Sequence, residues 1–507
     1  MKLYRIFPLI TLGLFGAAGI ATTPKYQMTL LPISPLHKFS AATDLNDVGE
    51  VVGTGITESP FQYFPYRWKM DGSYTILQVP AGAADCTPRS INAQGRIVGD
   101  YKVTINGTTY QRGVRWSSEN FARTFDLLSG WQTTSASLKG ISDADHIVGD
   151  GNGEVVNGSP DQRVQGVRGT YAEKPISPTG FLTQDANATS RLVAVNSFGT
   201  AVGTARDSQG RNVVIRHKNS ISTLGVPSGY QSASGTDINE PAAVTLNATT
   251  SGGRTDPFRW TTGVGFTSLP KLLGTNNLSY SALGLNDAGE AVGYLNPTPF
   301  EFYGVLWTGG TIHALDNIVA NRGAWSISGA TDINNRGEII ASTVSPGNSR
   351  AAILQPVQTV QIDLTLEDFI GDASQKLLWL VIRDLTTGQA DTRTISLPAN
   401  TSQTTITVET PCQGPCEVYA GGRSWLFQAA PVTLSRFGSG QVTLSLPNGD
   451  VDSDNAVTIF DYIQLSADFD KPVDTLALDP DSDLDGDGWV TVFDYIILSS
   501  NFDRVGD

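Results

Sequence analysis

The stretch DLNDVGEVVG at positions 44–53 recurs six more times in this chain of 507 residues. The later copies are SINAQGRIVG (90–99), GISDADHIVG (140–149), AVNSFGTAVG (194–203), DINEPAAVTL (237–246), GLNDAGEAVG (284–293) and DINNRGEIIA (332–341). Each copy places an apolar residue before Asn or Ser, then turn residues, then a short apolar stretch, and Gly supplies a left-handed position except in the fifth copy. This pattern predicts a tight β-hairpin. Successive copies start 43 to 54 residues apart, which indicates a repeat architecture.

A second signature follows six of the seven hairpins by about 20 residues, as in PYRWK, GVRWS and PFRWT, and a further apolar stretch comes after it. Each unit therefore supplies about four short strands, as one blade of a β-propeller does. The units resemble the bacterial extracellular-repeat family called HAF over roughly residues 40–355. Seven units predict a seven-bladed β-propeller-like domain at residues 22–356; an open β-solenoid or two smaller propellers are the alternatives.

The seventh unit is one strand short, because no fourth strand follows AAILQP at 351–356. An extra strand pattern, YQMTLLPI at 26–33, precedes the first unit. We expect this strand to complete the seventh unit, so that the two ends of the repeat close the ring.

Several side chains recur in phase with the repeat, so packing roles are expected for them. The tryptophans are predicted to pack between blades, with an aromatic sugar-binding ring as the alternative. The arginines that precede them should bond backbone carbonyls or the Asp of the hairpin motif, and the motif aspartates should stabilise turns. These residues are Trp68, Trp116, Trp260 and Trp307; Arg67, Arg115, Arg168, Arg216 and Arg259; and Asp44, Asp237 and Asp332.

The N-terminus, MKLYRIFPLITLGLFGAAGIATTP, has the pattern of a secretory signal peptide. Basic residues precede an apolar run and small residues, which predicts a signal peptide at residues 1–21 and an extracellular or cell-surface location. No later segment is apolar and long enough to span a membrane. The net charge of −15 and the lack of a basic patch argue against a nucleic-acid partner.

Residues 357–447 read as alternating strands separated by turns, which predicts a small β-sandwich. The segment resembles carboxypeptidase-regulatory-like or Ig-like modules at the level of fold. Cys412 and Cys416 in CQGPC could close a small disulfide loop, whereas Cys86 is expected to be a buried or free thiol. Trp425 is expected in the core.

The last 60 residues hold most of the charge: 15 Asp, no Glu, one Lys and one Arg, a net charge of −13. Two segments of twelve residues there, DVDSDNAVTIFD from Asp450 and DLDGDGWVTVFD from Asp483, are near-copies 33 residues apart. Carboxylates at positions 1, 3, 5 and 12 match the calcium loop of an EF-hand, in which position 7 offers a backbone carbonyl and position 9 acts through water. Two calcium ions are predicted, with the ligands Asp450, Asp452, Asp454, Ala456, Thr458 and Asp461, and Asp483, Asp485, Asp487, Trp489, Thr491 and Asp494.

Each loop is followed by a helical pattern, and position 12 is Asp rather than the usual Glu. Loop then helix, in duplicate, resembles a dockerin domain over residues 448–507. The helices should each present an apolar face, through Ile463, Leu465 and Phe469 and through Ile496, Leu498 and Phe502, and pack on each other. By the resemblance, positions 10 and 11 recognise a cohesin-like or cell-surface protein; the alternative is that they pack the helices together. These residues are Ile459, Phe460, Val492 and Phe493.

The sequence contains four histidines, none at metal or triad spacing, and no nucleophile elbow, zinc-protease helix or phosphate loop. No catalytic residue is therefore predicted. The favoured interpretation is a non-catalytic binding or adhesion protein, with the propeller as recognition domain for a glycan or protein and the calcium module as docking or anchoring device. The alternative is an enzyme of extracellular polysaccharide degradation, a glycosidase or lyase on the propeller, delivered to a complex through its dockerin.

Overall fold

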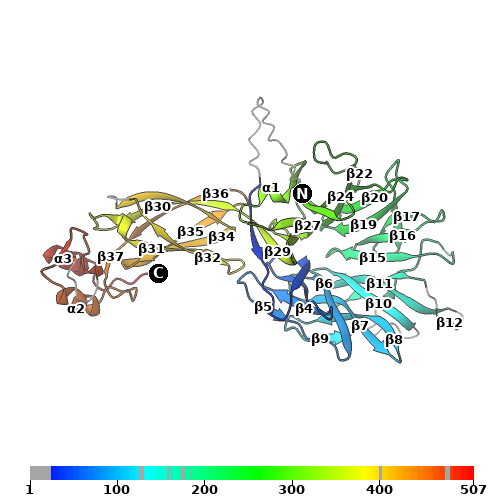
Figure 1. Ribbon diagram of the computed structural model, residues 1–507, viewed down its shortest axis with the longest axis horizontal. Helices are drawn as coiled ribbons and strands as arrows, with labels where there is room; N and C mark the ends of the chain where they lie inside the picture. The colour runs from blue at the N-terminus through cyan, green and yellow to red at the C-terminus, as the bar shows by residue number, and fades with distance from the viewer. Residues whose placement is uncertain are drawn as a thin grey trace.

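A computed structural model describes residues 24–124, 131–156, 159–160, 163–172, 177–183, 185–398, 402–473 and 480–507. The signal peptide predicted at residues 1–21 lies outside these ranges. The described chain is mainly β: a broad group of sheets is followed by a narrower pair of sheets and then by two short helices at the far end (Figure 1). Within this described part, no helix is long and apolar enough to cross a membrane.

Residues 24–356, the repeat region, form seven antiparallel sheets in their described part, one for each hairpin motif. The first four are β2 (Phe39–Leu45), β3 (Val51–Ile56), β4 (Tyr63–Trp68) and β5 (Tyr74–Ile76); β6 (Ala83–Ile91), β7 (Ile97–Ile105), β8 (Thr108–Trp116) and β9 (Ala122–Thr124); β10 (Trp131–Ile141), β11 (His146–Val156), β13 (Gln165–Thr170) and β14 (Ser177–Pro178), with β12 (Ser159–Pro160) on β11; and β15 (Ser190–Val195), β16 (Ala201–Arg206), β17 (Asn212–His217) and β18 (Ile221–Gly225).

The fifth sheet is β19 (Ser232–Ile238), β20 (Val244–Thr249), β21 (Thr255–Thr261) and β22 (Gly265–Ser268), and the sixth is β23 (Ser279–Leu285), β24 (Ala291–Thr298), β25 (Glu301–Thr308) and β26 (Thr311–Ala314), followed by helix α1 (Leu315–Ile318). The seventh contains β27 (Ser326–Ile333), β28 (Ile339–Ser345) and β29 (Asn348–Pro356). The sheets radiate around a common centre, so the region is propeller-like (Figure 1).

Strand β1 (Tyr26–Leu30) completes the seventh sheet, which confirms the prediction made from the missing strand. It pairs antiparallel with β29, with Tyr26 opposite Pro356 and Leu30 opposite Ala352. The first and seventh sheets also share a core, in which Leu45 and Trp68 meet Ile340 and Ile353. The two ends of the repeat region therefore lie together.

All seven predicted hairpins are present, each joining the first two strands of its sheet. Glycines such as Gly49 take the left-handed conformation (φ 80°) that the motif predicts. Asp145 takes this position in the third copy (φ 65°) and Ala242 in the fifth (φ 63°). Sequence reasoning identified only the fifth exception. The hairpin is thus kept where Gly is replaced.

The Asn of the motif links each hairpin to the next. Asn46 Oδ1 accepts a hydrogen bond from the Glu50 N–H (2.8 Å), and its Nδ2 donates to the carbonyl of Asn92 (3.0 Å). The same side-chain donation runs from Asn92 to Ser142, Asn196 to Asn239, Asn239 to Asn286, Asn286 to Asn334, and Asn334 to Asn46. The last of these joins the seventh hairpin to the first.

The recurrent tryptophans pack between sheets, as predicted. Trp68, Trp116 and Trp307 are buried, and their indole N–H groups donate to backbone carbonyls at the start of their own units. Trp116 packs with Val52 of the preceding sheet. Trp260 is partly exposed and lies beside the Arg216 guanidinium, 4.9 Å from ring centre to Cζ. An exposed aromatic ring for sugar is therefore not formed by these four residues.

The recurrent arginines also bond as predicted. Three of them donate to backbone carbonyls of the next unit. Arg67 donates to Ser118, Arg168 to Lys218 and Gly199, and Arg259 to Gly289. Arg115 instead lies over the ring of Tyr171, at 5.1 Å. These contacts add polar links between neighbouring sheets.

Residues 357–447, the two-sheet region, form two facing sheets. One has the order β33 (Gln403–Thr410), β30 (Gln358–Leu366), β36 (Ser439–Leu446), and the other β32 (Ala390–Ser396), β31 (Leu377–Asp384), β34 (Gly414–Gly422), β35 (Ser424–Leu434), β37 (Asn448–Asp450); a 3-10 turn, η1, covers Ala373–Gln375. Alternate residues of β30 are buried, and they share one core with β31, β34 and β36. Trp425 lies in that core, as predicted.

The disulfide considered for CQGPC is not formed. Cys412 and Cys416 are both free and buried, and Cys86 is a free buried thiol as expected. The two sulfurs contact different carbonyls: Cys412 Sγ lies 3.2 Å from the Ile382 oxygen and Cys416 Sγ 3.5 Å from the Gly414 oxygen. Gly414 turns the chain between them with φ 77°.

Buried ion pairs join the two-sheet region to the repeat region. Both Nη atoms of Arg436 donate to the carboxylate of Glu290, each at 2.6 Å, and Glu290 is 6% exposed. Burial alone would raise the pKa of Glu290, but the hydrogen bonds from Arg436 lower it below its usual value. Arg336 also pairs with the fully buried Asp384. The two regions are therefore held in a fixed contact.

Candidate metal centres, partner surface and channel

The last 60 residues build two loop–helix units. In their described part, β37 leads into the first acidic loop and helix α2 (Ile459–Ala467); β38 (Lys471–Pro472), the turn η3 (Pro480–Ser482), the second loop with β39 (Trp489–Val490), and helix α3 (Val492–Ser500) follow. The sequence predicted both helices. We call residues 448–507 the C-terminal module.

Both helices begin at a capping box. Thr458 accepts a hydrogen bond from the Phe460 N–H, and the Asp461 carboxylate accepts one from the Thr458 N–H. Thr491 and Asp494 repeat this arrangement at α3. Such caps satisfy backbone donors that the first turn of a helix leaves free. Position 9 of each loop thus starts the helix that follows.

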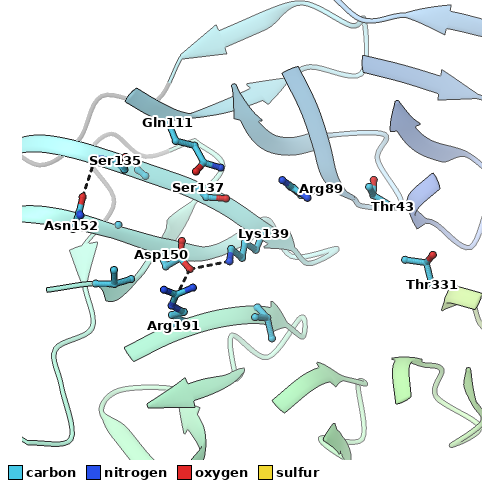
Figure 2. Close-up of a pocket in the computed structure, with 14 residues that line it drawn as sticks. Thr43, Arg89, Gln111, Ser135, Ser137, Lys139, Asp150, Asn152, Arg191 and Thr331 are labelled. Atoms are coloured by element: carbon cyan, nitrogen blue, oxygen red, sulfur yellow. Dashed lines mark hydrogen bonds and ion pairs between the residues drawn. The ribbon is translucent and has the colours of Figure 1, made fainter. Parts of the chain in front are cut away.

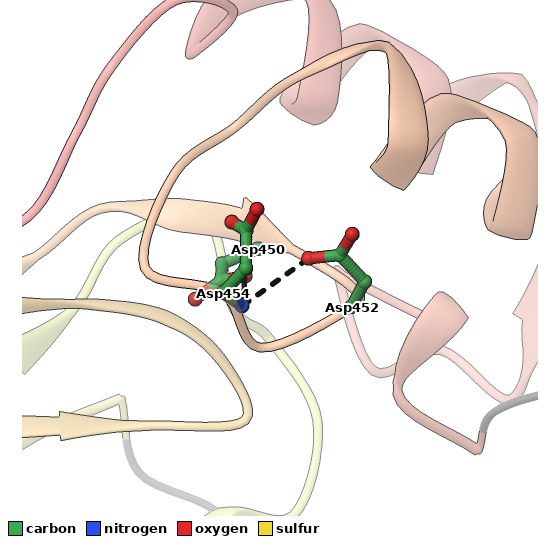
Figure 3. Close-up of side chains that lie close together, drawn as sticks. All are labelled: Asp450, Asp452 and Asp454. Carbon is green, nitrogen blue, oxygen red and sulfur yellow. Dashed lines mark hydrogen bonds between the residues drawn. The ribbon is translucent and has the colours of Figure 1, made fainter.

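The first three predicted carboxylates of each loop lie together. Asp450, Asp452 and Asp454 each offer an oxygen within 4.8 Å of the others, and Asp483, Asp485 and Asp487 form the equivalent group. Figure 3 shows the first group, in which the Asp454 N–H donates to Asp450 and Asp452 (3.0 and 3.2 Å). Hard oxygen ligands converging in this way suit a cation such as calcium.

The electrostatics of the loops favour a bound cation. Burial, and then the carboxylates of Asp461 and Asp454, raise the pKa of Asp450 to about 6. Burial and the carboxylates of Asp494 and Asp485 likewise raise the pKa of Asp483 to about 6. Burial and, to a smaller extent, the neighbouring negative charges thus disfavour the ionised carboxylates, which a positive ion among them would relieve.

Position 12 lies outside each group of three. Asp461 and Asp494 are fully buried, where they cap the helices and accept loop N–H groups: Asp461 from Asp452 (3.0 Å), and Asp494 from Leu484 and Asp485 (2.6 and 3.1 Å). Their carboxylates therefore tie the loop to the helix.

The other predicted positions have local roles. Ala456 forms an isolated bridge with Val505, and Trp489 lies in β39, paired with Pro472. Position 6 of each loop makes a sharp left-handed turn, with φ 68° at Asn455 and φ 99° at Gly488. Short paired segments thus hold the backbone beside each loop.

The predicted partner-binding residues are exposed, in matching pairs. Ile459 and Val492 are each 52% exposed, and Phe460 and Phe493 each 61%. Further residues extend this apolar surface in pairs: Tyr462 and Tyr495 and Ile463 and Ile496 in the helices, and Phe469 and Phe502 just after them. The tyrosine rings meet edge to face at 5.8 Å between centroids. The alternative, that positions 10 and 11 pack the helices together, does not fit these exposures.

The predicted helix core was only partly right. Leu465 and Leu498 are buried, but Ile463, Phe469, Ile496 and Phe502 are exposed. The module instead buries Val451, Val457, Leu484, Val490 and Ile497 with the two leucines and with Leu426 of β35. A strand of the two-sheet region supplies part of the core, so the helices need not cover all of their apolar residues with each other.

Backbone contacts also seat the module on the two-sheet region. The Ile370 and Gly371 N–H groups donate to the Asp485 carbonyl (2.8 and 3.2 Å), inside the second acidic loop. Gly371 must be glycine there, since a Cβ would lie 2.3 Å from the Gly486 oxygen. The sequence carried no local signal for this contact.

Three pockets, each sharing lining residues with the next, lie at the centre of the repeat region, and we call them together the channel. One of them, the wide cavity, has a volume of about 550 Å³ and is lined by polar residues of several sheets (Figure 2). Asp44, Asp237 and Asp332 line a narrower part. Asp44 and Asp237 each accept N–H groups from the next residue and from the neighbouring unit, which confirms a structural role. Burial raises the pKa of Asp237 to about 7.

No family model and no curated protein matches this chain. Among solved structures, it is similar to streptogramin B lyase (12% identity, 66% of this chain and 98% of that chain, TM-score 0.38). It is also similar to the β-propeller domain of the Trilobed protease from Pyrococcus furiosus (10%, 63% and 95%, 0.37). A third similar structure is a type II cohesin–X-dockerin complex from Acetivibrio cellulolyticus (14%, 29% and 97%, 0.24). These likenesses are distant, and the fold rests on the sheets described above.

Proposed function

We propose that this chain is an extracellular or cell-surface binding protein without catalytic activity, exported by a signal peptide at residues 1–21. Residues 22–356 serve as a seven-bladed, HAF-type recognition propeller for a glycan or protein. Residues 357–447 form a β-sandwich that links it to residues 448–507, a dockerin-like module that binds two calcium ions and docks the protein to a cohesin-like or cell-surface partner.

The observation that carries this proposal is the duplicated loop–helix unit. Each copy gathers three carboxylates within 4.8 Å and then starts a capped helix with an Asp at position 12. Oxygen ligands of this number and spacing are those that calcium prefers. Two copies with the same local hydrogen bonds support two ions.

The docking role is supported by the exposed apolar pairs. Ile459 and Phe460 on α2 match Val492 and Phe493 on α3 in exposure. Contiguous apolar surface of this kind on a soluble module marks an interaction site. Because the two helices present closely similar residues in the same order, we expect a partner to engage either of them.

Calcium titration of the full chain tests the metal assignment. Isothermal titration calorimetry should give two calcium ions per chain, and differential scanning calorimetry should show a module transition that moves to higher temperature with calcium and back with a chelator. No binding up to millimolar calcium would refute the calcium module.

Docking is tested with calcium-saturated protein against purified cohesins and against cell envelopes. The double variant Phe460→Asp/Phe493→Asp should lose binding but keep both calcium ions, whereas either single variant should retain binding. Phe198→Asp is the control, since Phe198 is an exposed phenylalanine of the repeat region. Retained binding by the double variant would place docking elsewhere.

A further inference from the structure

The channel is lined by one bulged residue from every sheet. The first strand of each sheet has a register shift at the same point, just before the hairpin, where one residue lacks a partner on the second strand. A β-bulge turns a side chain out of the regular alternation. The seven bulged residues all line the channel: Thr43, Arg89, Lys139, Val193, Thr236, Leu283 and Thr331.

Two neighbouring members of this ring are basic, and they face the wide cavity. Arg89 and Lys139 line it together with Arg191, so three consecutive sheets each contribute a cation (Figure 2). Asp150 is the carboxylate that lines the same cavity. Three cations and one carboxylate therefore line this cavity, which gives it an excess of positive side chains.

The cations are held in place by neighbouring carboxylates. Arg89 Nε lies 2.8 Å from Asp100, which also accepts a hydrogen bond from Ser137 (2.9 Å). Lys139 Nζ lies 2.9 Å from Asp150, and Arg191 Nε 4.0 Å from the same oxygen. Asp100 engages Arg89 through Nε and Nη2, which leaves Nη1 for a ligand. Such pre-positioned donors suit a planar carboxylate.

The hairpin end of the channel is acidic, since Asp47, Asp143, Glu240 and Asp287 line it. Asp44, Asp237 and Asp332 line the part between, where burial raises the pKa of their carboxyl groups. An anionic ligand is therefore favoured beside the basic residues of the wide cavity and disfavoured at the hairpin end.

We propose that the wide cavity binds a hydroxylated carboxylate, such as a uronic acid unit of an acidic polysaccharide. Arg89, Lys139 and Arg191 receive the carboxylate, while Gln111, Asn152 and Ser135 offer polar atoms for hydroxyl groups. The volume of about 550 Å³ accommodates one or two sugar units. This inference rests on the proposed recognition role of the repeat region and names its ligand class.

Calorimetric titration of the full chain with digalacturonate tests the proposal. Galactose and inorganic phosphate are titrated as comparison ligands. Digalacturonate should bind, and the neutral sugar and phosphate should bind at least tenfold more weakly. Arg191→Gln should weaken digalacturonate binding about 10- to 100-fold, the range of one charged hydrogen bond. Lys139→Gln/Arg191→Gln should abolish it, and Arg211→Gln, on an exposed turn of the same sheet as Arg191, should not.

The melting temperature checks that each variant is folded. Arg191→Gln should disturb the fold least, because the Arg191 side chain is 54% exposed. Absence of digalacturonate binding at 10 mM, equal binding of phosphate, or unchanged affinity in Arg191→Gln would each overturn the proposal. Calcium binding and docking by the C-terminal module are measured on the same protein. Their survival separates a failure of this inference from a failure of the proposed function.

Discussion

The position-12 aspartates show how much one carboxylate does in the acidic loops. Asp461 caps α2 at the Thr458 N–H and also accepts the Asp452 N–H of the loop. Spacing alone predicted it as a metal ligand, but its helix-capping and loop-bracing bonds became visible only in three dimensions. Asp461 thus connects the order of the loop to the order of the helix.

Asp461→Asn should weaken calcium binding at the first loop about 10- to 100-fold, because the amide has a single acceptor oxygen for the two N–H groups. The second loop should keep its affinity. Calorimetric titration of the full chain reports both sites. Asp503→Asn is the matched control, an exposed aspartate of the same module outside the loops. Equal affinities for the two variants would contradict this role.

At the scale of elements, the repeat was predicted well because its signals are local. Every hairpin carries its own turn residues, and the missing fourth strand of the seventh unit could be inferred by counting. The helix faces were predicted less well: Ile463 and Phe469 follow a helical apolar pattern yet are exposed, because Leu426 from a distant strand completes the module's core. Contacts between segments far apart in sequence leave no periodic signature.

Strand β1 offers a sharp test of ring closure. The Leu31 N–H donates to the Ala351 carbonyl. Because N–H groups of alternate residues point to the same side of a strand, the Thr29 N–H also faces β29. The Met28 N–H points the other way and donates to Asn321. Thr29→Pro should therefore remove a ladder bond and lower the melting temperature of the repeat region by several degrees. Leu30→Pro, whose N–H faces away from β29, should cost clearly less. Equal melting temperatures for the two variants would show that β1 does not secure the ring.

At the scale of the whole molecule, the three regions are joined in series by specific contacts. Arg436 and Glu290 fix the two-sheet region on the repeat region, and Ile370 and Leu426 fix the C-terminal module on the two-sheet region. These pairings could not be predicted from the sequence, since nothing local marks Glu290 as the partner of an arginine 146 residues away.

Arg436→Met should destabilise the repeat region by about 3–5 kcal/mol, because it leaves the buried Glu290 without its cation. Urea unfolding followed by tryptophan fluorescence measures this loss. Arg423→Met is the control, since Arg423 is 59% exposed and lies 3.6 Å from its partner Asp481. Adding Glu290→Gln to Arg436→Met should recover much of the stability. No difference between the two arginine variants would show that this pair does not support the contact.

The chain of Asn amides around the hairpins has a direction and a single gap. Ser142 accepts the bond from Asn92 but carries no amide to pass one on to the fourth hairpin, so the described hairpins form six links rather than seven. The ring therefore has a seam between its third and fourth sheets, away from the place where its two ends meet. Thermal opening should start at that seam, and Ser142→Asn should slow amide hydrogen exchange on both sides of it. The two ends of the repeat region thus meet at one junction, and the gap in the chain of amides lies at another.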